Sequence, residues 1–308
     1  MSRRAWTLFA IVSVLWGIPY LFIAIAIDEG VPPAFLAWAR VVLGALVLLP
    51  LAWHAGLLRG LRGRWSWLRP YALAEIVVPF PLIAAGEQYV SSSIAAILIA
   101  AVPLIVALLA LRFDATERVR GARLGGLLIG LAGVVALVGV DVGGRNDELL
   151  GVGAILVAAV GYAAGPMMLK RKLADLDPRI TMLGALTIAA VMLTPLAAAD
   201  LPDEMLSASA IASILVLGAL CTAAAFVFFG SLVAEVGAGR ALVITYVNPA
   251  IAVAAGVIVL GERPGAGAVA GLLLIIAGSW LATGGGLPPS PRAAGRLWRR
   301  QAGAGMSR

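Results

Sequence analysis

The sequence predicts an all-α integral membrane protein of ten transmembrane helices, arranged as two five-helix repeats of inverted topology. Three observations predict this fold: the composition, the spacing of long apolar stretches, and a phrase that recurs about half a chain length later. Hydrophobic residues make up 62% of the 308-residue chain and charged residues 13%, whereas soluble domains average about 45–50% and about 25%. Polar groups cannot cover the surface of such a chain, so we expect a bilayer as its solvent.

Stretches of about 20 apolar residues, the length that crosses a bilayer as a helix, occur ten times. In the first half they lie at 6–27, 33–53, 70–89, 93–112 and 121–140. In the second half they lie at 150–170, 180–199, 208–231, 238–260 and 266–284. We therefore expect a first repeat over 6–140, a second repeat over 150–284, and a disordered basic cytoplasmic tail over 285–308.

The basic residues indicate how these helices are oriented. They gather before the first span, in the connections between spans two and three, four and five, and six and seven, and in the tail, while the alternate connections carry acids such as Asp28 and Asp203. Because basic loops stay on the cytoplasmic side, both ends of the chain should be cytoplasmic. The net charge of +7 is spread over these short loops, and this pattern argues against nucleic acid as a partner.

The recurring phrase starts the fifth and the tenth span. "ERVRGARLGGLLIGLAG" occupies 117–133 and "ERPGAGAVAGLLLIIAG" occupies 262–278, with seven identities in seventeen positions at an offset of 145 residues. Pro33 and Pro178 hold corresponding places at nearly the same offset. Because five spans separate the two copies, the second repeat must enter the membrane in the opposite direction. Duplication of this kind is a recurrent construction of secondary transporters.

Three short motifs carry a family resemblance. They are "WG" at Trp16–Gly17 in the first helix, "FLAWAR" ending in Arg40 in the second, and "LGER" at 260–263 closing the ninth. With ten spans, they resemble the EamA-type branch of the drug/metabolite transporter superfamily over about residues 6–284. The resemblance implies a bacterial inner-membrane carrier that exports amino acids, metabolites or drugs through a cavity between the halves. The first repeat departs from the pattern, because "FDATER" leaves Glu117 without a preceding glycine.

Glycine and proline interrupt corresponding spans of both repeats. Proline removes a backbone hydrogen bond of a helix, and a bilayer tolerates this where the break faces protein or a water-filled cavity. The interruptions are Gly17 and Pro19 in span one, Pro103 in span four, Gly165 and Pro166 in span six, and Pro249 in span nine. Paired breaks mark the site of many transporters, so we expect these spans to line the cavity. Kinks that only improve packing are the alternative.

Polar and aromatic side chains near these breaks complete the expected substrate-binding pocket. They are Trp16, Tyr20, Tyr162, Tyr246 and Asn248. An aromatic lining suits amphipathic or cationic solutes through burial and cation–π contacts. The alternative is the belt of tryptophan and tyrosine found at membrane interfaces.

Charge inside a predicted span is costly and marks a functional hypothesis. Arg40 lies in the outer half of span two and Glu87 in the outer half of span three, so we expect an ion pair that is either structural or part of coupling. Glu75, nearer the inner face of span three, is the candidate for proton coupling. Glu75 could also snorkel to the interface or cap a helix.

These observations predict a secondary transporter that exports or exchanges a small metabolite, amino acid or drug-like solute by alternating access, with proton coupling as an option. The alternative is a membrane-embedded enzyme acting on lipid or prenyl groups, and a channel or structural subunit is a third class. There is no Walker A motif to bind ATP, and we expect no cofactor, no metal and no enzymatic activity. The expected partners are a small solute and membrane lipid, and homodimerisation stays open.

Overall fold

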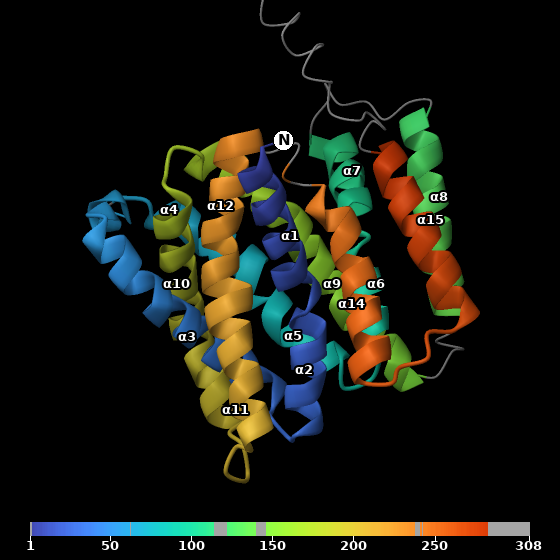
Figure 1. The fold of residues 1–308 in the computed structure, drawn as a ribbon, viewed down its shortest axis with the longest axis horizontal. Helices are drawn as coiled ribbons and strands as arrows, with labels where there is room; N and C mark the ends of the chain where they lie inside the picture. The colour runs from blue at the N-terminus through green and yellow to red at the C-terminus, as the bar shows by residue number, and fades with distance from the viewer. Residues whose placement is uncertain are drawn as a thin grey trace, which may run out of the picture.

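The protein is described by a computed structural model that covers residues 2–61, 63–113, 122–139, 146–237, 241 and 243–282. Every regular element within these ranges is a helix. The helices stand side by side in one bundle, with most of their axes running between the same two ends (Figure 1). The expected tail over 285–308 and the Glu117–Arg118 pair of the first repeated phrase lie outside the described residues.

The helices of the first half follow the apolar stretches closely. They are α1 (Arg3–Gly17), α2 (Pro19–Asp28), α3 (Pro33–His54), η1 (Leu57–Leu61), α4 (Trp65–Ala72), η2 (Leu73–Val77), α5 (Pro79–Gly86), α6 (Ser92–Ile99), α7 (Val102–Phe113) and α8 (Ala122–Leu137). The second half contains α9 (Asn146–Met168), η4 (Leu169–Leu173), α10 (Pro178–Ala199), α11 (Ala208–Leu215), η5 (Val216–Ala224), α12 (Ala225–Val236), α14 (Ile244–Val259) and α15 (Ala266–Ala282). Three of these elements, η2, η4 and η5, are π-helical.

Seven helical stretches are long and apolar enough to cross a membrane, so the chain is a multi-pass membrane protein. They are Arg3–Asp28, Pro33–His54, Trp65–Gly86, Ser92–Leu109, Asn146–Met168, Pro178–Ala199 and Ala208–Val236. Three shorter apolar helices, Leu124–Leu137, Ile244–Val259 and Ala266–Leu281, fall within the predicted fifth, ninth and tenth spans. Parts of those three predicted spans lie outside the described residues.

The predicted breaks divide into two kinds. Span one is interrupted as expected, since α1 ends at Gly17 and α2 begins at Pro19. Span four is interrupted too, and Pro103 is the second residue of α7. At Pro166 and Pro249 the helix continues past the proline without a break. A membrane helix tolerates the loss of one backbone hydrogen bond when neighbouring groups pack around it.

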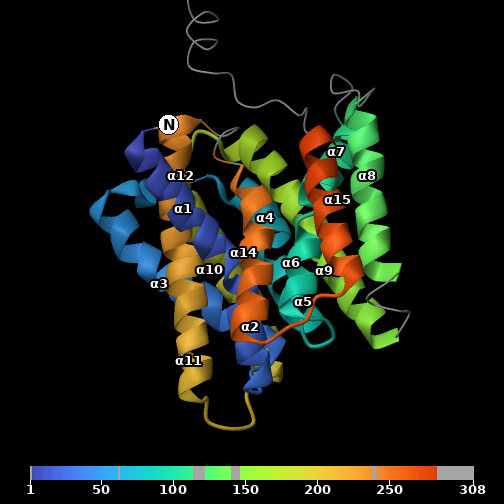
Figure 2. The same cartoon turned by 45° about the vertical axis from the view of Figure 1, so that its right-hand side comes forward.

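The two copies of the repeated phrase pack against each other. Helices α8 and α15 run side by side in both views (Figures 1 and 2) and form the most extensive helix pair of the bundle. A Cβ atom at Gly133 would lie 2.9 Å from Gly271 O, and one at Gly278 would lie 2.6 Å from Gly126 O. The contact of Gly126 with Gly278 and that of Gly133 with Gly271 place rising residue numbers of one helix against falling numbers of the other, so the helices are antiparallel. Glycines allow such close backbone approach.

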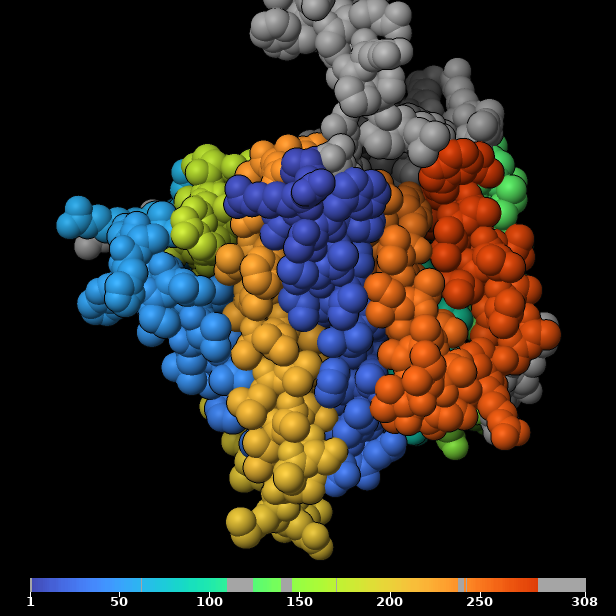
Figure 3. Space-filling model, in the orientation of Figure 1, coloured from blue at the N-terminus to red at the C-terminus, as the bar shows by residue number. Residues whose placement is uncertain are grey.

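The remaining pairs connect helices that are distant in sequence. Helix α3 packs against α10, and α6 packs against α14. Helix α1 lies between α12 and α14, as the space-filling view shows (Figure 3), while α9 packs against α5, η2, α6 and α7. Each half is thus held together largely through contacts with the other half.

Candidate functional site

Arg40 occupies the interior of the bundle on α3, with only 9% of its surface exposed. Its Nε donates a hydrogen bond to Thr222 Oγ1 at 2.9 Å, and its guanidinium lies 4.0 Å from the centroid of the Phe80 ring. Thr222 belongs to the second half and Phe80 to the first. A cation held by one hydroxyl and one aromatic face keeps further donors for another group.

The π-helical element η5 places Thr222 for this contact. Its hydroxyl donates to Leu217 O, five residues earlier, at 2.8 Å, and is therefore oriented to accept from Arg40. Single π-turns are rare and occur often at functional sites, because they turn side chains away from the regular helical register. No sequence pattern points to Thr222, since an isolated threonine in an apolar span is usually a packing residue.

Glu87 follows the last residue of α5 and is 8% exposed. Neither of its carboxylate oxygens has a hydrogen-bond partner among the described residues. The expected ion pair with Arg40 is therefore not formed, although the two charges interact electrostatically. The reason is that the hydrogen bond to Thr222 and the contact with the Phe80 ring orient the guanidinium toward those two residues. The interior thus contains a buried cation and a buried carboxylate that do not neutralise each other by contact.

Two tyrosines from different halves lie near these charges. Tyr20 on α2 and Tyr162 on α9 both interact electrostatically with Arg40. Both also pack against one apolar cluster, whose buried members include Ile23, Leu36 and Leu217. The structure therefore brings together four of the predicted site residues, Tyr20, Arg40, Glu87 and Tyr162. We call these four residues with Thr222 the central polar cluster.

Glu75 lies apart from Glu87 on the same predicted span, in the π-helical element η2. Its Oε2 is buried without a hydrogen-bond partner among the described residues. The carboxyl packs on α9, where a Cβ atom at Gly165 would come within 3.1 Å of Glu75 Cδ. Gly165 therefore makes room for the carboxyl, which ties this predicted break to a predicted charge.

The other three predicted pocket residues lie elsewhere. Trp16 stacks against Phe226 and Phe229 of α12, with ring centroids 5.2 and 4.8 Å away. The Tyr246 hydroxyl donates to Ser279 O at 3.5 Å. The Asn248 amide, turned with its nitrogen toward the carbonyls, donates to Ser13 O at 3.2 Å. These side chains join α14 to α1 and α15, and α1 to α12, and none of the three is among the residues of the cluster that contains Tyr20 and Tyr162.

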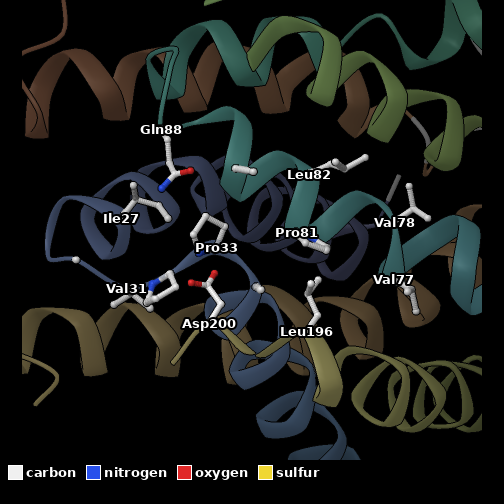
Figure 4. Close-up of a pocket in the computed structure, with 14 residues that line it drawn as sticks. Ile27, Val31, Pro33, Val77, Val78, Pro81, Leu82, Gln88, Leu196 and Asp200 are labelled. Atoms are coloured by element: carbon white, nitrogen blue, oxygen red, sulfur yellow. The ribbon is translucent and has the colours of Figure 1, made fainter. Parts of the chain in front are cut away.

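An open pocket of about 800 Å³ lies at the end of the bundle near the connection between α2 and α3. It is lined by Ile27, Gly30, Val31, Pro32, Pro33, Ala34, Val77, Val78, Pro81, Leu82, Ala85, Gln88, Leu196 and Asp200. The side chains of Gln88 and Asp200 extend toward Pro33 (Figure 4). None of the predicted pocket residues lines this space, but Gln88 directly follows Glu87.

A further polar contact was not anticipated from the sequence. Glu262, in the "LGER" motif, accepts hydrogen bonds from Ser92 and Ser93 at the start of α6. The motif could have drawn attention to Glu262, but its partners lie about 170 residues away in sequence. Within the described ranges, no three His, Cys, Asp or Glu side chains lie together so that they could hold a metal ion.

Comparison with known proteins agrees with this architecture. The chain is 24% identical over 289 residues to an uncharacterized transporter of Archaeoglobus fulgidus, covering 90% of this chain and 98% of that protein. It is 25% identical over 277 residues to the uncharacterized transporter YvbV of Bacillus subtilis, covering 89% and 90%. The protein PagO of Salmonella typhimurium is 30% identical over 132 residues, and that match covers 42% of this chain and less than half, 43%, of PagO.

A solved crystal structure shares the fold. It superposes with a TM-score of 0.64 at 21% sequence identity and covers 92% of this chain and 97% of the other. The model of the EamA-like transporter family matches twice, over residues 4–139 and 149–284. The two matches together span most of the chain, one in each half. The chain therefore belongs to the EamA-like transporter family, within the drug/metabolite transporter superfamily.

Proposed function

We propose that this protein is a secondary transporter that moves a small zwitterionic solute across the membrane by alternating access. The observation that carries the proposal is the pair of buried opposite charges, Arg40 and Glu87, which make no ion pair with each other. An uncompensated charge inside a membrane is costly. A solute with a carboxylate for Arg40 and an ammonium for Glu87 would compensate both charges at once, and Tyr20 and Tyr162 would flank its apolar part.

The architecture that we propose is ten spans in two inverted repeats, 6–140 and 150–284. The helix contacts support it, because adding or subtracting 145 residues converts the helix pairs of one repeat into helix pairs that are also in contact. The packing of α1 against α12 and α14 corresponds to that of α9 against α5 and α7. The pairs α3 with α10 and α8 with α15 each correspond to themselves. Such self-correspondence is the expected mark of a pseudo-twofold axis in the membrane plane.

The site lies where an alternating-access mechanism needs it. Arg40 and Glu87 come from the first repeat, whereas Thr222 and Tyr162 come from the second, so movement of one repeat against the other changes the cluster. We propose that the protein resides in a bacterial inner membrane with both ends cytoplasmic, which the placement of basic loops supports. In this orientation the 800 Å³ pocket opens away from the cytoplasm, and Asp200 and Gly30 mark its rim.

Glu75 is the group that we propose for coupling transport to protons. Its carboxyl is buried against Gly165 of the other repeat, with one oxygen unpartnered among the described residues. It therefore occupies an inter-repeat contact and interacts electrostatically with Tyr162 of the central polar cluster, but it is a different carboxylate from the one that would bind the solute. A coupling site needs this arrangement, because the ion must respond to the same movement as the solute without displacing it.

Exchange measured in proteoliposomes tests the proposal. Proteoliposomes containing the purified protein are loaded with unlabelled amino acids of varied side chains, and the uptake of each labelled counterpart is measured. The same measurement is made with matched amines and carboxylates, each of which lacks one of the two charges. We expect saturable exchange of at least one zwitterion, no exchange of the single-charge analogues, and loss of exchange in Arg40→Gln and Glu87→Gln. Arg263→Gln, outside the cluster, is the matched control. Equal exchange of zwitterions and single-charge analogues would contradict the proposed site.

No observation in the described residues favours the enzyme alternative, because Glu75 and Glu87 face different neighbours.

A further inference from the structure

The carboxylate of Glu262 binds the first turn of α6. Its Oε1 accepts hydrogen bonds from Ser92 N at 2.9 Å and from Ser92 Oγ at 2.7 Å. Its Oε2 accepts from Ser93 N at 3.1 Å and also from Ser93 Oγ. Four donors therefore converge on one carboxylate at a helix N-terminus, where backbone N–H groups are otherwise unsatisfied and negative charge is favoured.

The surrounding backbone is shaped for this carboxylate. Gly261 has a positive φ of 67°, which turns the chain back after α14, and Glu262 N donates to Gly256 O at 3.1 Å. A Cβ atom at Gly256 would lie 2.5 Å from Glu262 Oε2 and 2.8 Å from Ser93 Oγ. Any larger residue at 256 would push the carboxylate off α6. Two glycines of the second half therefore serve one contact with the first half.

This contact joins the two repeats at one end of the bundle. Ser92 and Ser93 belong to the first repeat, and Glu262 lies in the connection from α14 to α15, which runs along the lower end of Figure 1, opposite the N label. Glu87 approaches the same end, because its charge and that of Glu262 interact. The contact therefore lies between the central polar cluster and the solvent at that end.

We propose that Glu262, Ser92 and Ser93 form a gate latch, which closes this end of the solute path and must break when that end opens. The proposal rests on the alternating-access function above. When Glu87 is ionised and no solute is bound to it, its charge repels the like charge of Glu262 and weakens the latch. An ammonium group bound at Glu87 cancels that repulsion and strengthens the latch. Solute binding thereby favours closure of this end, which is the link between site and gate that alternating access requires.

Labelling of the native cysteine tests the latch without knowledge of the solute. Cys221 is 1% exposed and interacts electrostatically with Arg40, so it reports when water reaches the central polar cluster. Oriented vesicles carrying the protein are treated with a membrane-impermeant maleimide from the side of Ser92. We expect Glu262→Gln and the double variant Ser92→Ala/Ser93→Ala to label about tenfold faster than the native protein, since bonds to a charged group are lost. Arg263→Gln, at the neighbouring residue, should label at the native rate.

A cross-link separates a moving latch from a permanent fastening. In a Cys221→Ser background, Ser93→Cys and Glu262→Cys are joined by a short bifunctional methanethiosulfonate and then released by a reductant. We expect the cross-link to stop solute exchange in proteoliposomes and the reductant to restore it. Exchange that continues in the cross-linked protein, or native labelling rates in the latch variants, would overturn the latch. Absence of exchange in the native protein would instead overturn the transport function, so the two failures are distinguishable.

Discussion

Replacement of Gly278 by alanine tests the helix contact between the two copies of the repeated phrase. A Cβ atom at this position would lie 2.5 Å from Gly130 Cα, which is 0.9 Å less than the 3.4 Å at which ordinary contact begins. Gly126 O would lie 2.6 Å away. The obstructing atoms are all backbone, so no side chain can rotate aside. Gly130 N lies closer still, so helices α8 and α15 must separate by at least the missing 0.9 Å.

The cost of this separation follows from two effects. Overpacking of a well-packed interior costs about 1–3 kcal/mol. A gap of about 0.5–1 Å also forfeits about a quarter to a half of the dispersion energy of the contacts that it opens. We therefore expect Gly278→Ala to lower the free energy of unfolding by about 3 kcal/mol, near the upper end of the overpacking range.

Gly125→Ala is the matched control, because it lies on α8 and its Cβ would meet nothing within 4 Å. It should be neutral or stabilising by up to about 1 kcal/mol through the higher helix propensity of alanine. Both variants are unfolded in lipid nanodiscs by heat and by a denaturing detergent, with tryptophan fluorescence as the readout. A Gly278→Ala variant that is as stable as Gly125→Ala would refute the close approach of the two helices.

Three further predictions concern individual side chains. Thr222→Val removes the acceptor of Arg40 Nε, so the apparent affinity for an exchanged zwitterion should fall about tenfold; an unchanged concentration dependence of exchange would show that Thr222 does not position the guanidinium. Glu75→Gln should leave exchange intact but abolish solute accumulation driven by a proton gradient, whereas accumulation equal to that of the native protein would remove Glu75 from coupling. Hydrogen bonds from the Arg179 side chain and backbone hold the pKa of Asp177 below its usual range. The ionised carboxylate therefore stabilises the fold when the pH is above the unfolded-state pKa of about 3.9. This stabilisation is lost as the pH falls through the lower pKa of the folded state. Asp177→Asn, which still caps α10, should therefore lose less thermal stability than the native protein between about pH 5 and pH 2, and parallel pH profiles would contradict this assignment.

The patterns that depend on composition and periodicity predicted the bundle well. Apolar length located the helices, because a bilayer sets how long a spanning helix must be. The repeated phrase identified α8 and α15 as corresponding elements, and their antiparallel contact through Gly133 and Gly278 follows from the opposed orientation of the two copies. Charge inside an apolar span pointed to Arg40 and Glu87, because such residues are rare in that setting.

The partners of these residues could not be predicted from sequence. Arg40 contacts Thr222, 182 residues away, and the π-helical turn that aims this threonine leaves no mark in the hydrophobic pattern. The expected Arg40–Glu87 pair failed for the same reason, since the position of the guanidinium depends on Phe80 and Thr222 together. Proline was also an incomplete guide: Pro19 starts a new helix, whereas Pro249 lies within a continuous one.

The opposed orientation of the two repeats can be measured with single cysteines at positions 145 residues apart. Four single-cysteine variants are made in a Cys221→Ser background. In the first pair, cysteine replaces Gly30 or its counterpart Asp175. In the second pair, it replaces Gly60 or its counterpart Met205. A membrane-impermeant maleimide is then applied to vesicles of known orientation. The account predicts that the two members of each pair are labelled from opposite faces, with Gly30 and Met205 on one face and Gly60 and Asp175 on the other. Labelling of both members of a pair from the same face would contradict the inverted repeat and the transport mechanism built on it.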